Sequence, residues 1–186
     1  MSEHVCPVWI GYLLASPIRK LFHNPQKILG PIVQPGMTVL DVGSAMGFFS
    51  IPAAEMVGSE GRVICADCQP RMLEKLTQRA RTAGVESQIE THACSTSSLG
   101  LEELEGQVDV ARAVAMVHEA PDPERLLTEI FNTLKPGGLL LVAEPKGHVT
   151  DAQIKETLQI TESLGLQIIE RPSVRRTFSF VMQRAA

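Results

Sequence analysis

The sequence predicts an α/β fold of the doubly wound, Rossmann-like type, with a mostly parallel seven-stranded sheet that ends in an antiparallel hairpin. From residue 38 onward, short apolar β-rich runs alternate with longer amphipathic runs, which is the pattern of βαβ units. The last two β-rich runs are separated by a short turn that contains Pro172, and so short a connection joins antiparallel strands.

Seven runs are predicted as strands, because buried parallel strands are apolar on both faces. They cover residues 38–42, 62–66, 89–93, 108–114, 139–143, 166–170 and 177–183. Amphipathic runs predict helices over residues 47–57, 70–83, 123–134 and 151–164. Pro70 and Pro123 suit the first turn of a helix, and Gly84 suits a C-terminal stop.

The composition favours one globular domain. The chain has 186 residues, of which 44% are hydrophobic and 20% charged. We assign residues 31–186 to this domain. Residues 1–30 precede the first predicted strand and carry an apolar, amphipathic stretch that includes Trp9 and Phe22. We expect this segment to form an N-terminal lid over the domain or to cover the partner in a possible homodimer.

Charge and cysteine usage exclude several classes of function. A net charge of -4 and a pI near 5.7 argue against a nucleic-acid partner, because nonspecific affinity for phosphate backbones comes from Lys and Arg. No basic start and apolar run form a secretory signal, and no stretch is long enough to span a bilayer. The four cysteines are not spaced as a disulfide framework. We therefore expect a cytoplasmic protein with reduced thiols and no membrane partner.

The cysteines and histidines also raise the question of a metal. The segment from Cys65 to Cys68 has C-x-x-C spacing but lacks a second pair, so incidental thiols are the preferred interpretation. His4, Cys6 and His23 could form a metal or soft-substrate site with Cys94 or His118, but their spacing is not diagnostic. No metal site is predicted.

The most informative stretch runs from Val39 to Ser50, a buried strand that ends in small residues and opens a helix. In open α/β sheets the ligand crevice lies outside the carboxyl ends of the strands, where small residues let the backbone approach the ligand. A dinucleotide fingerprint would need a small residue at Phe48. Asp41 would repel a pyrophosphate but suits a cationic amino-acid group. Both details favour an aminoacyl nucleoside over a nicotinamide dinucleotide.

The segment Asp41-Val-Gly43-Ser44-Ala45-Met-Gly47 resembles the D-x-G-x-G-x-G motif of class I S-adenosylmethionine-dependent methyltransferases. Ala45 replaces the middle glycine, which would be costly if that residue needs a positive φ. Residues 35–41, the strand that ends at Asp67, and the turn at residues 134–139 resemble the family's next landmarks in the same order. The resemblance covers roughly residues 35–186. It is greatest to small ubiquinone and menaquinone C-methyltransferase-like members and, more distantly, to arsenite methyltransferases.

The resemblance implies the roles of individual residues around S-adenosyl-L-methionine and its product S-adenosyl-L-homocysteine. Asp41 and Gly43 would face the methionine part, and Asp67 would grip the ribose hydroxyls. Cys68 would lie at the adenine face, Cys94 and Ser95 at the adenine edge, and Ala113 near the sulfonium. The whole predicted cofactor set comprises Asp41, Gly43, Ser44, Gly47, Asp67, Cys68, Cys94, Ser95 and Ala113.

His118 is the catalytic candidate, because it follows the fourth strand at the mouth of the crevice and a histidine accepts a proton near neutral pH. A role in ordering the loop is the alternative, and a structural role is favoured for Glu144. We expect methyl transfer to a small, hydrophobic or planar acceptor, with a thiol or metalloid acceptor second. A non-catalytic partner subunit that binds the donor or its product stays open, because Ala113 to Ala115 carry no polar catalytic motif.

Overall fold

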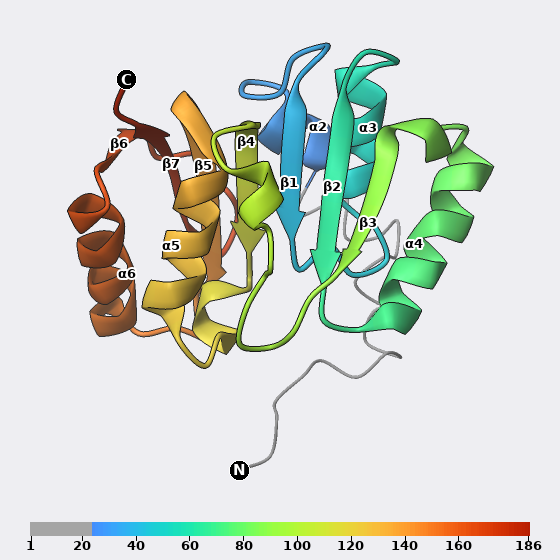
Figure 1. The fold of residues 1–186 in the computed structure, drawn as a ribbon. Coiled ribbons are helices and arrows are strands. Elements are labelled where there is room, and N and C mark those ends of the chain that lie inside the picture. Colours follow the sequence, from blue (N-terminus) through green and yellow to red (C-terminus); the bar gives the residue numbers. More distant parts are fainter. Residues whose placement is uncertain (1–23) are drawn as a thin grey trace.

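The computed structural model describes residues 24–186 and arranges them as one twisted sheet with helices on both faces (Figure 1). The strands are β1 (Thr38–Val42), β2 (Arg62–Asp67), β3 (Ile89–Ala93), β4 (Val108–Val114), β5 (Leu134–Pro145), β6 (Leu166–Glu170) and β7 (Thr177–Arg184). Their order in the sheet is β3-β2-β1-β4-β5-β7-β6. Strands β1 to β5 pair in parallel, whereas β7 is antiparallel to both β5 and β6. The predicted fold class is therefore confirmed.

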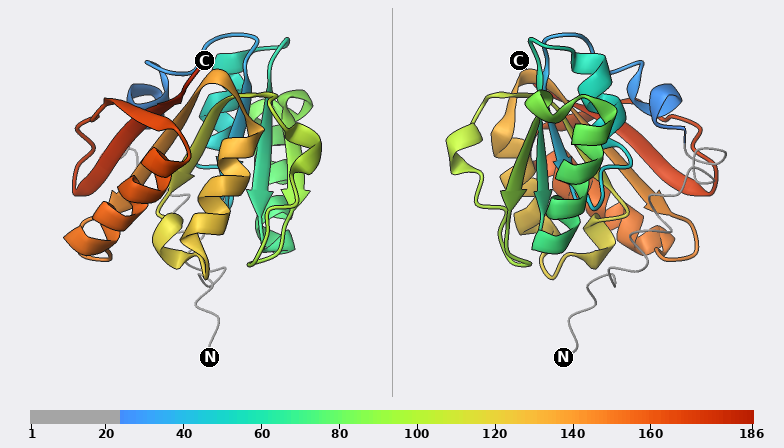
Figure 2. Two further views of the ribbon diagram at one scale, coloured as in Figure 1. Left: turned by 60° about the vertical axis from the view of Figure 1, so that its left-hand side comes forward. Right: turned by 90° about the vertical axis from the view of Figure 1, so that its right-hand side faces the viewer.

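Five α-helices and three 3₁₀ turns connect the strands within the described residues. The helices are α2 (Pro25–Leu29), α3 (Ser50–Val57), α4 (Pro70–Ala83), α5 (Pro123–Thr133) and α6 (Asp151–Ser163). The 3₁₀ turns are η2 (Glu86–Gln88), η3 (Glu102–Leu104) and η4 (Val117–Glu119). Helices α2, α3 and α4 cover one face of the sheet, and α5 and α6 cover the other (Figures 1 and 2). None of the helices in this part of the chain has the length and hydrophobicity needed to cross a bilayer.

The core lies in two layers because successive residues of a strand point to opposite faces. Val39 and Val63 pack under α2, α3 and α4, whereas their neighbours Leu40 and Ile64 pack under α5 and α6. These strand side chains are almost completely buried. Each such burial stabilises the fold by about 1.5–3 kcal/mol, so both faces must be covered. This explains why apolar residues occupy consecutive positions in β1 and β2.

The carboxyl ends of the parallel strands meet at one edge, which is the lower edge in Figure 1. The loops that follow β1, β2, β3 and β4 therefore lie next to one another there. Helix α2 stands at the amino-terminal end of the described residues and contributes to the core. The Asn24 side chain caps this helix, and Leu29 is buried in the layer under α3. The remainder of the predicted lid, residues 1–23, lies outside the described residues.

Two predicted boundaries differ from the structure by three residues or more, and several others differ by one or two. The helix predicted from Gly47 begins at Ser50, because Gly47 has a φ of 78°, which is incompatible with a right-handed helix. Strand β5 begins at Leu134 rather than at residue 139. The predicted turn is part of the strand because Leu134 pairs with Val108 across a register shift, with Gly137 at a φ of 78°.

A buried ion pair joins the two central strands. Asp41 of β1 and Arg112 of β4 are register partners, and an Arg112 Nη1 contacts the Asp41 Oδ1. The guanidinium lies 4.1 Å from the centroid of the Phe49 ring, and Ser50 Oγ donates to Asp41 Oδ2 at 2.5 Å. Both charged side chains are at most 5% exposed. The pair therefore ties β1 and β4 to the start of α3.

We expect the substitution Arg112→Met to lower the free energy of unfolding by about 3–5 kcal/mol, because it leaves the Asp41 carboxylate buried without its counter-charge. Urea unfolding followed by circular dichroism measures this change. The double variant Asp41→Asn/Arg112→Met should recover much of the loss, since no charge is then buried alone. Arg81→Met is the control, because its pair with Glu86 lies on the surface. A loss for Arg112→Met below about 1 kcal/mol, as exposed pairs give, would contradict a structural role for this pair.

Candidate functional site

The loop after β1 has left-handed backbone at alternate positions. Gly43, Ala45 and Gly47 have φ values of 69°, 46° and 78°. This conformation costs a residue with a Cβ roughly 1–2 kcal/mol, so Ala45 is the strained member of the three. The Ala45 N–H donates to Asp67 Oδ2 at 2.8 Å, which compensates for part of this cost. The middle position of the motif thus has a positive φ although an alanine stands there in place of glycine.

Hydrogen bonds fix this loop against the end of β2 and against α4. The N–H groups of Gly43 and Ser44 both donate to the Ala66 carbonyl, at 2.9 and 3.1 Å. The Arg79 guanidinium of α4 donates to the Met46 carbonyl. The loop is therefore held from two sides, and its remaining surface faces the edge where the strands end.

One feature of the loop points to a ligand, and a second shows how the loop packs within the protein. Ser44 is 3% exposed, and its Oγ has no hydrogen-bond partner among the described residues. Buried hydroxyls in proteins almost always have a partner. At Gly43, a Cβ would lie only 2.2 Å from the Met116 sulfur, so any larger residue would displace that side chain. Met116, at the end of β4, therefore packs directly on the loop.

Asp67 ends β2 beside this loop. Its Oδ2 accepts from the Ala45 N–H and its Oδ1 accepts from the Gln69 N–H at 2.9 Å. Burial raises the pKa of the Asp67 carboxyl, while the two hydrogen bonds oppose that rise. Each carboxylate oxygen has a second lone pair, so Asp67 can still accept from two further donors. A pair of vicinal hydroxyls offers such donors.

Asp41 is turned away from the edge. Both of its oxygens are engaged inside the core, one by Arg112 and the other by Ser50. Its negative charge is therefore already balanced, and the carboxylate is 1% exposed. The predicted contact between Asp41 and the methionine part stays a prediction, and Arg112 is the residue with which such a cation would compete.

The other predicted cofactor residues lie at different depths. Cys68 and Cys94 are partly buried and follow β2 and β3 at the same edge as Asp67. The Ser95 hydroxyl is used within its own turn, where it accepts from the Ser98 N–H at 2.9 Å. Ala113 is fully buried in the layer under α5 and α6, so its side chain does not reach the mouth.

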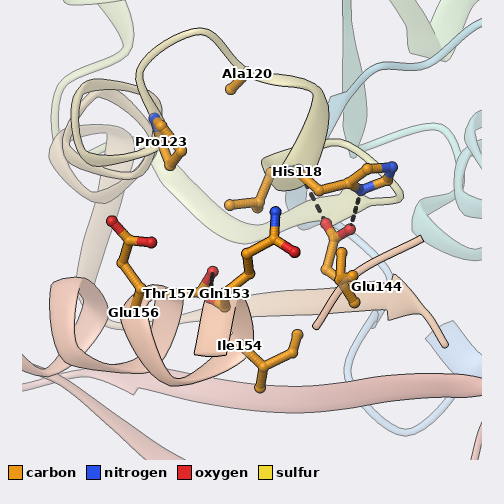
Figure 3. A pocket seen from close by; sticks show the side chains of 10 residues that line it. His118, Ala120, Pro123, Glu144, Gln153, Ile154, Glu156 and Thr157 are labelled. Atoms are coloured by element: carbon orange, nitrogen blue, oxygen red, sulfur yellow. Dashed lines mark hydrogen bonds and ion pairs between the residues drawn. The ribbon is translucent and has the colours of Figure 1, made fainter. Parts of the chain in front are cut away.

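His118 lies in η4, directly after β4, and is held by Glu144 at the end of β5 (Figure 3). His118 Nδ1 contacts Glu144 Oε2, while Glu144 Oε1 accepts from the N–H groups of Met116 and Val117 at 3.2 and 2.9 Å. Glu144 is 1% exposed. The hydrogen bond to this carboxylate raises the pKa of His118, against the opposing effect of burial. With Nδ1–H donated to Glu144, neutral His118 presents Nε2 as a proton acceptor.

A small pocket opens beside this pair, between η4, the start of α5 and the first turns of α6 (Figure 3). Its volume is about 180 Å³. The lining residues are Val117, His118, Ala120, Pro123, Glu144, Val149, Gln153, Ile154, Glu156 and Thr157. Apolar side chains from η4, α5, α6 and the neighbouring loops alternate there with the polar groups of His118, Glu144 and α6. The His118 ring also stacks edge-on against His148, with centroids 5.9 Å apart.

Sequence reasoning missed Arg112, Met116 and the partnership of Glu144 with His118. A lone arginine within the apolar strand VDVARAV was a usable signal for Arg112, because a buried charge needs a partner. Met116 gave no such signal. Its position follows from Ala115, whose φ of 56° turns the chain sharply at the end of β4.

His4, Cys6 and His23, which the sequence suggested as members of a metal or soft-substrate site, lie outside the described residues. Within residues 24–186, no three His, Cys, Asp or Glu side chains are grouped so that they could hold a metal ion.

The doubly wound sheet, the loop after β1 and the acid that ends β2 define a nucleoside-binding α/β domain. Residues 33–173 match the methyltransferase domain family, and this match covers more than half of the chain. The chain therefore belongs to that family, and its fold is that of the class I S-adenosylmethionine-dependent methyltransferases, as the sequence predicted.

Relatives of several kinds are similar to the chain. An arsenite methyltransferase from Halobacterium salinarum is 32% identical over 111 residues, which is 59% of this chain and 27% of the relative. The ubiquinone/menaquinone biosynthesis C-methyltransferase UbiE from Enterobacter sp. is 31% identical over 112 residues, 60% of this chain and 44% of the relative. The chain thus matches less than half the length of these relatives. The crystal structure of an S-adenosylmethionine-dependent methyltransferase from Aquifex aeolicus superposes with a TM-score of 0.85 at 23% identity, covering 96% of this chain and 99% of that one.

The pKa of His118 is expected to lie above its ordinary value of 6.5, and Glu144→Gln should return it toward that value. The chemical shift of the His118 Cε1–H, followed by NMR against pH and assigned with His118→Gln, measures both. A raised pKa in the folded state means that the pair stabilises the fold below the unfolded-state pKa and that this contribution is lost as pH rises through the folded-state pKa. The difference in the free energy of unfolding between wild type and Glu144→Gln should therefore narrow as pH rises from the unfolded-state pKa of His118 through its folded-state pKa. Identical titration curves for the two proteins would refute the pairing.

Proposed function

We propose that this chain transfers the methyl group of S-adenosyl-L-methionine to a small, hydrophobic or planar acceptor. The observation that carries the proposal is the loop after β1, whose left-handed turns are bonded to the carboxylate of Asp67. Membership of the methyltransferase domain family supports it. One relative is named for arsenite and another for ubiquinone and menaquinone biosynthesis, so their names give no single acceptor for this chain.

The residues of the loop and of β2 fit such a donor. The unpartnered Ser44 hydroxyl and the loop backbone would hold its amino-acid part, and Asp67 would accept from its ribose hydroxyls. Gly43 and Gly47 supply the backbone turns that allow close approach. Cys68 and Cys94 would flank its adenine, since they follow β2 and β3 at the same edge.

When bound, the donor supplies a methyl group that is already activated by a positively charged sulfur. The chain's own task is then to place an acceptor in line with that methyl group and to keep water out. Correct placement alone supplies several kcal/mol of the rate gain, up to about 7–11 kcal/mol in well-oriented systems. The end of β4 and η4 are the elements positioned for this task, because they border both the loop and the pocket.

His118 is the proposed catalytic base, with Glu144 as its positioning residue. Glu144 fixes the ring through Nδ1, so that Nε2 would take a proton from an acceptor that arrives protonated. The same hydrogen bond makes the imidazole more basic, because it stabilises the charged form. Glu144 also accepts from the backbone of η4, so the histidine and its supporting turn move together.

The size of the pocket beside His118 supports a small acceptor. Its volume of about 180 Å³ is below the roughly 300–1,000 Å³ that ligand pockets usually have. Its lining is mixed, with apolar residues such as Val117, Val149 and Ile154 beside polar ones such as Glu144 and Gln153. Such a wall suits a flat or branched carbon skeleton with one ionisable group near the histidine.

Binding of the donor is the first property to measure. Calorimetric titration with S-adenosyl-L-methionine and S-adenosyl-L-homocysteine should give binding that Asp67→Ala weakens by about 10–100-fold, since hydrogen bonds to a charged group contribute about 1.5–3 kcal/mol. Asp109→Asn is the matched control: this carboxylate also accepts a backbone N–H, from Thr38, but at the opposite edge of the sheet. NAD is the control ligand.

Absence of binding to either nucleoside would overturn the proposed function. Binding of unchanged affinity in Asp67→Ala would show that Asp67 does not accept from the ribose hydroxyls. If the donor binds but no labelled methyl group reaches any acceptor in a panel of phenols, quinols, thiols and arsenite, the chain is a non-catalytic binding subunit. Transfer to thiols or arsenite alone would select that acceptor class instead.

Turnover on the identified acceptor should fall by about 10²–10⁴-fold in His118→Ala, the usual contribution of a general base. For wild type, kcat/KM should rise with pH through the raised pKa of His118, because only the neutral ring accepts a proton. In Glu144→Gln this inflection should move to lower pH. A merely structural Glu144 would change the rate without moving the inflection.

The proposed lid is tested in the same assay by removing residues 1–22, which leaves the Asn24 cap and the buried Leu29 in place. A lid that covers the crevice predicts a higher KM and faster exchange of bound donor. If this deletion and His118→Ala both leave turnover intact, neither the lid nor the base is part of the mechanism.

A further inference from the structure

Cys68 and Cys94 are the first residues after two neighbouring strands, β2 and β3. Strands β2 and β3 are parallel, and the last pair in their register is Asp67 with Ala93. The Cys94 N–H then donates to the Asp67 carbonyl at 3.2 Å. In a parallel ladder an N–H bonds to the residue that precedes its partner, so this bond extends the register by one position. The residue opposite Cys94 is Cys68.

This arrangement meets the geometric requirement of a disulfide. Neighbouring strands lie about 4.7–4.9 Å apart, and a disulfide joins Cα atoms that are about 4.4–6.8 Å apart. Register partners in a sheet also point to the same face. Both cysteines are partly buried rather than enclosed, so a small oxidant can reach them. The Cys68 side chain is close enough to Cys94 to affect its titration.

The third cysteine of this region does not belong to the pair. Cys65 lies within β2, three positions before Cys68, and residues three apart in extended backbone point to opposite faces. Cys65 is 0% exposed and lies in the layer under α3 and α4, whereas Cys94 packs against the opposite layer. The C-x-x-C spacing in the sequence therefore does not create a dithiol, and the cross-strand pair does.

We propose that Cys68 and Cys94 form a reversible disulfide that closes the adenine side of the cofactor site. The effect on the cofactor rests on the proposed function, but the disulfide itself does not. With a peroxide as oxidant, the Cys68 thiol is oxidised to a sulfenic acid and one water is released. The Cys94 sulfur then attacks the Cys68 sulfur, the S–O bond breaks, and a second water carries away the oxygen and the thiol proton.

The environment assigns the order of these two steps. Burial first, and then the nearby Cys68 and Asp67, raise the pKa of Cys94 to about 11. Cys94 therefore stays protonated near neutral pH, and a thiol reacts with peroxide far more slowly than a thiolate. Cys94 is therefore disfavoured as the sulfur that is oxidised first, and the proposal gives it the resolving role. Closure of the disulfide should accelerate as pH rises.

The disulfide would act on the site through position. Cys68 directly follows Asp67, the proposed ribose acceptor, and Cys94 bonds to the Asp67 carbonyl. A covalent bridge would fix these strand ends at their closest approach and fill the space between the two side chains. We expect the oxidised protein to bind S-adenosyl-L-homocysteine at least about tenfold more weakly, a change of about 1.4 kcal/mol.

In the test, the reduced chain of 186 residues is treated with hydrogen peroxide, and the remaining thiols are blocked. Linked tryptic peptides are then identified by mass spectrometry. Because Cys65 and Cys68 share one tryptic peptide, the measurement is made in Cys65→Ala as well as in wild type. Cys6→Ser excludes a bridge to the amino-terminal cysteine. We expect a linked peptide that contains Cys94 in both variants and none in Cys68→Ser or Cys94→Ser. Calorimetry before oxidation, after oxidation and after dithiothreitol measures the effect on the cofactor.

Absence of a bridge between Cys68 and Cys94, or a bridge from either to Cys6, would overturn the proposal. A bridge that forms but leaves affinity unchanged would overturn its effect on the cofactor. If the reduced protein does not bind the nucleoside at all, the proposed function fails, and the peptide analysis still decides whether the disulfide forms.

Discussion

The buried contact between Asp41 and Arg112 places two opposite charges at the centre of the sheet, where neither could be tolerated alone. Because they are register partners on β1 and β4, the contact requires that these strands pair in one register only. The stacking of Arg112 on Phe49 and the bond from Ser50 then fix where α3 begins. The loop after β1 spans the short interval between β1 and α3, so both of its ends are set by this pair.

The same interaction changes how the family motif is understood in this chain. The acid that opens the motif is engaged in the core, and the loop offers instead the unpartnered hydroxyl of Ser44. Under the proposed function, specificity for a nucleoside would depend mainly on Asp67, whose oxygens hold the loop and retain capacity for a ligand. One carboxylate thus organises the loop and also faces the proposed ribose position.

Local sequence signals predicted the architecture because the relevant information is local. The β-rich runs at residues 38–42, 89–93 and 108–114 have the bounds of β1, β3 and β4. Strands β1 and β4 are almost wholly buried although Asp41 and Arg112 interrupt their apolar runs, whereas β3 at the edge of the sheet is partly exposed. The start of α3 was missed because a glycine at positive φ looks like a helix residue in an apolar pattern. The extension of β5 was missed because its bulge depends on pairing with β4.

The site was only partly predictable for a different reason. His118 was found because it follows a strand at the crevice, but its link to Glu144 joins residues 26 positions apart. The pairing of Cys68 with Cys94 likewise depends on the register of β2 and β3, whereas the C-x-x-C spacing drew attention to Cys65. Sequence spacing identifies neighbours along a helix or strand, and only the sheet identifies neighbours across it.

The left-handed Ala45 also bears on how the domain assembles. An alanine does not favour this conformation in an isolated chain, and here it is supported by a hydrogen bond to a strand that follows 22 residues later. The loop after β1 therefore reaches its final conformation only after β2 has docked beside β1. A ligand that binds only the docked form stabilises it by mass action, so saturation with nucleoside and resistance to heat are thermodynamically linked in this fold.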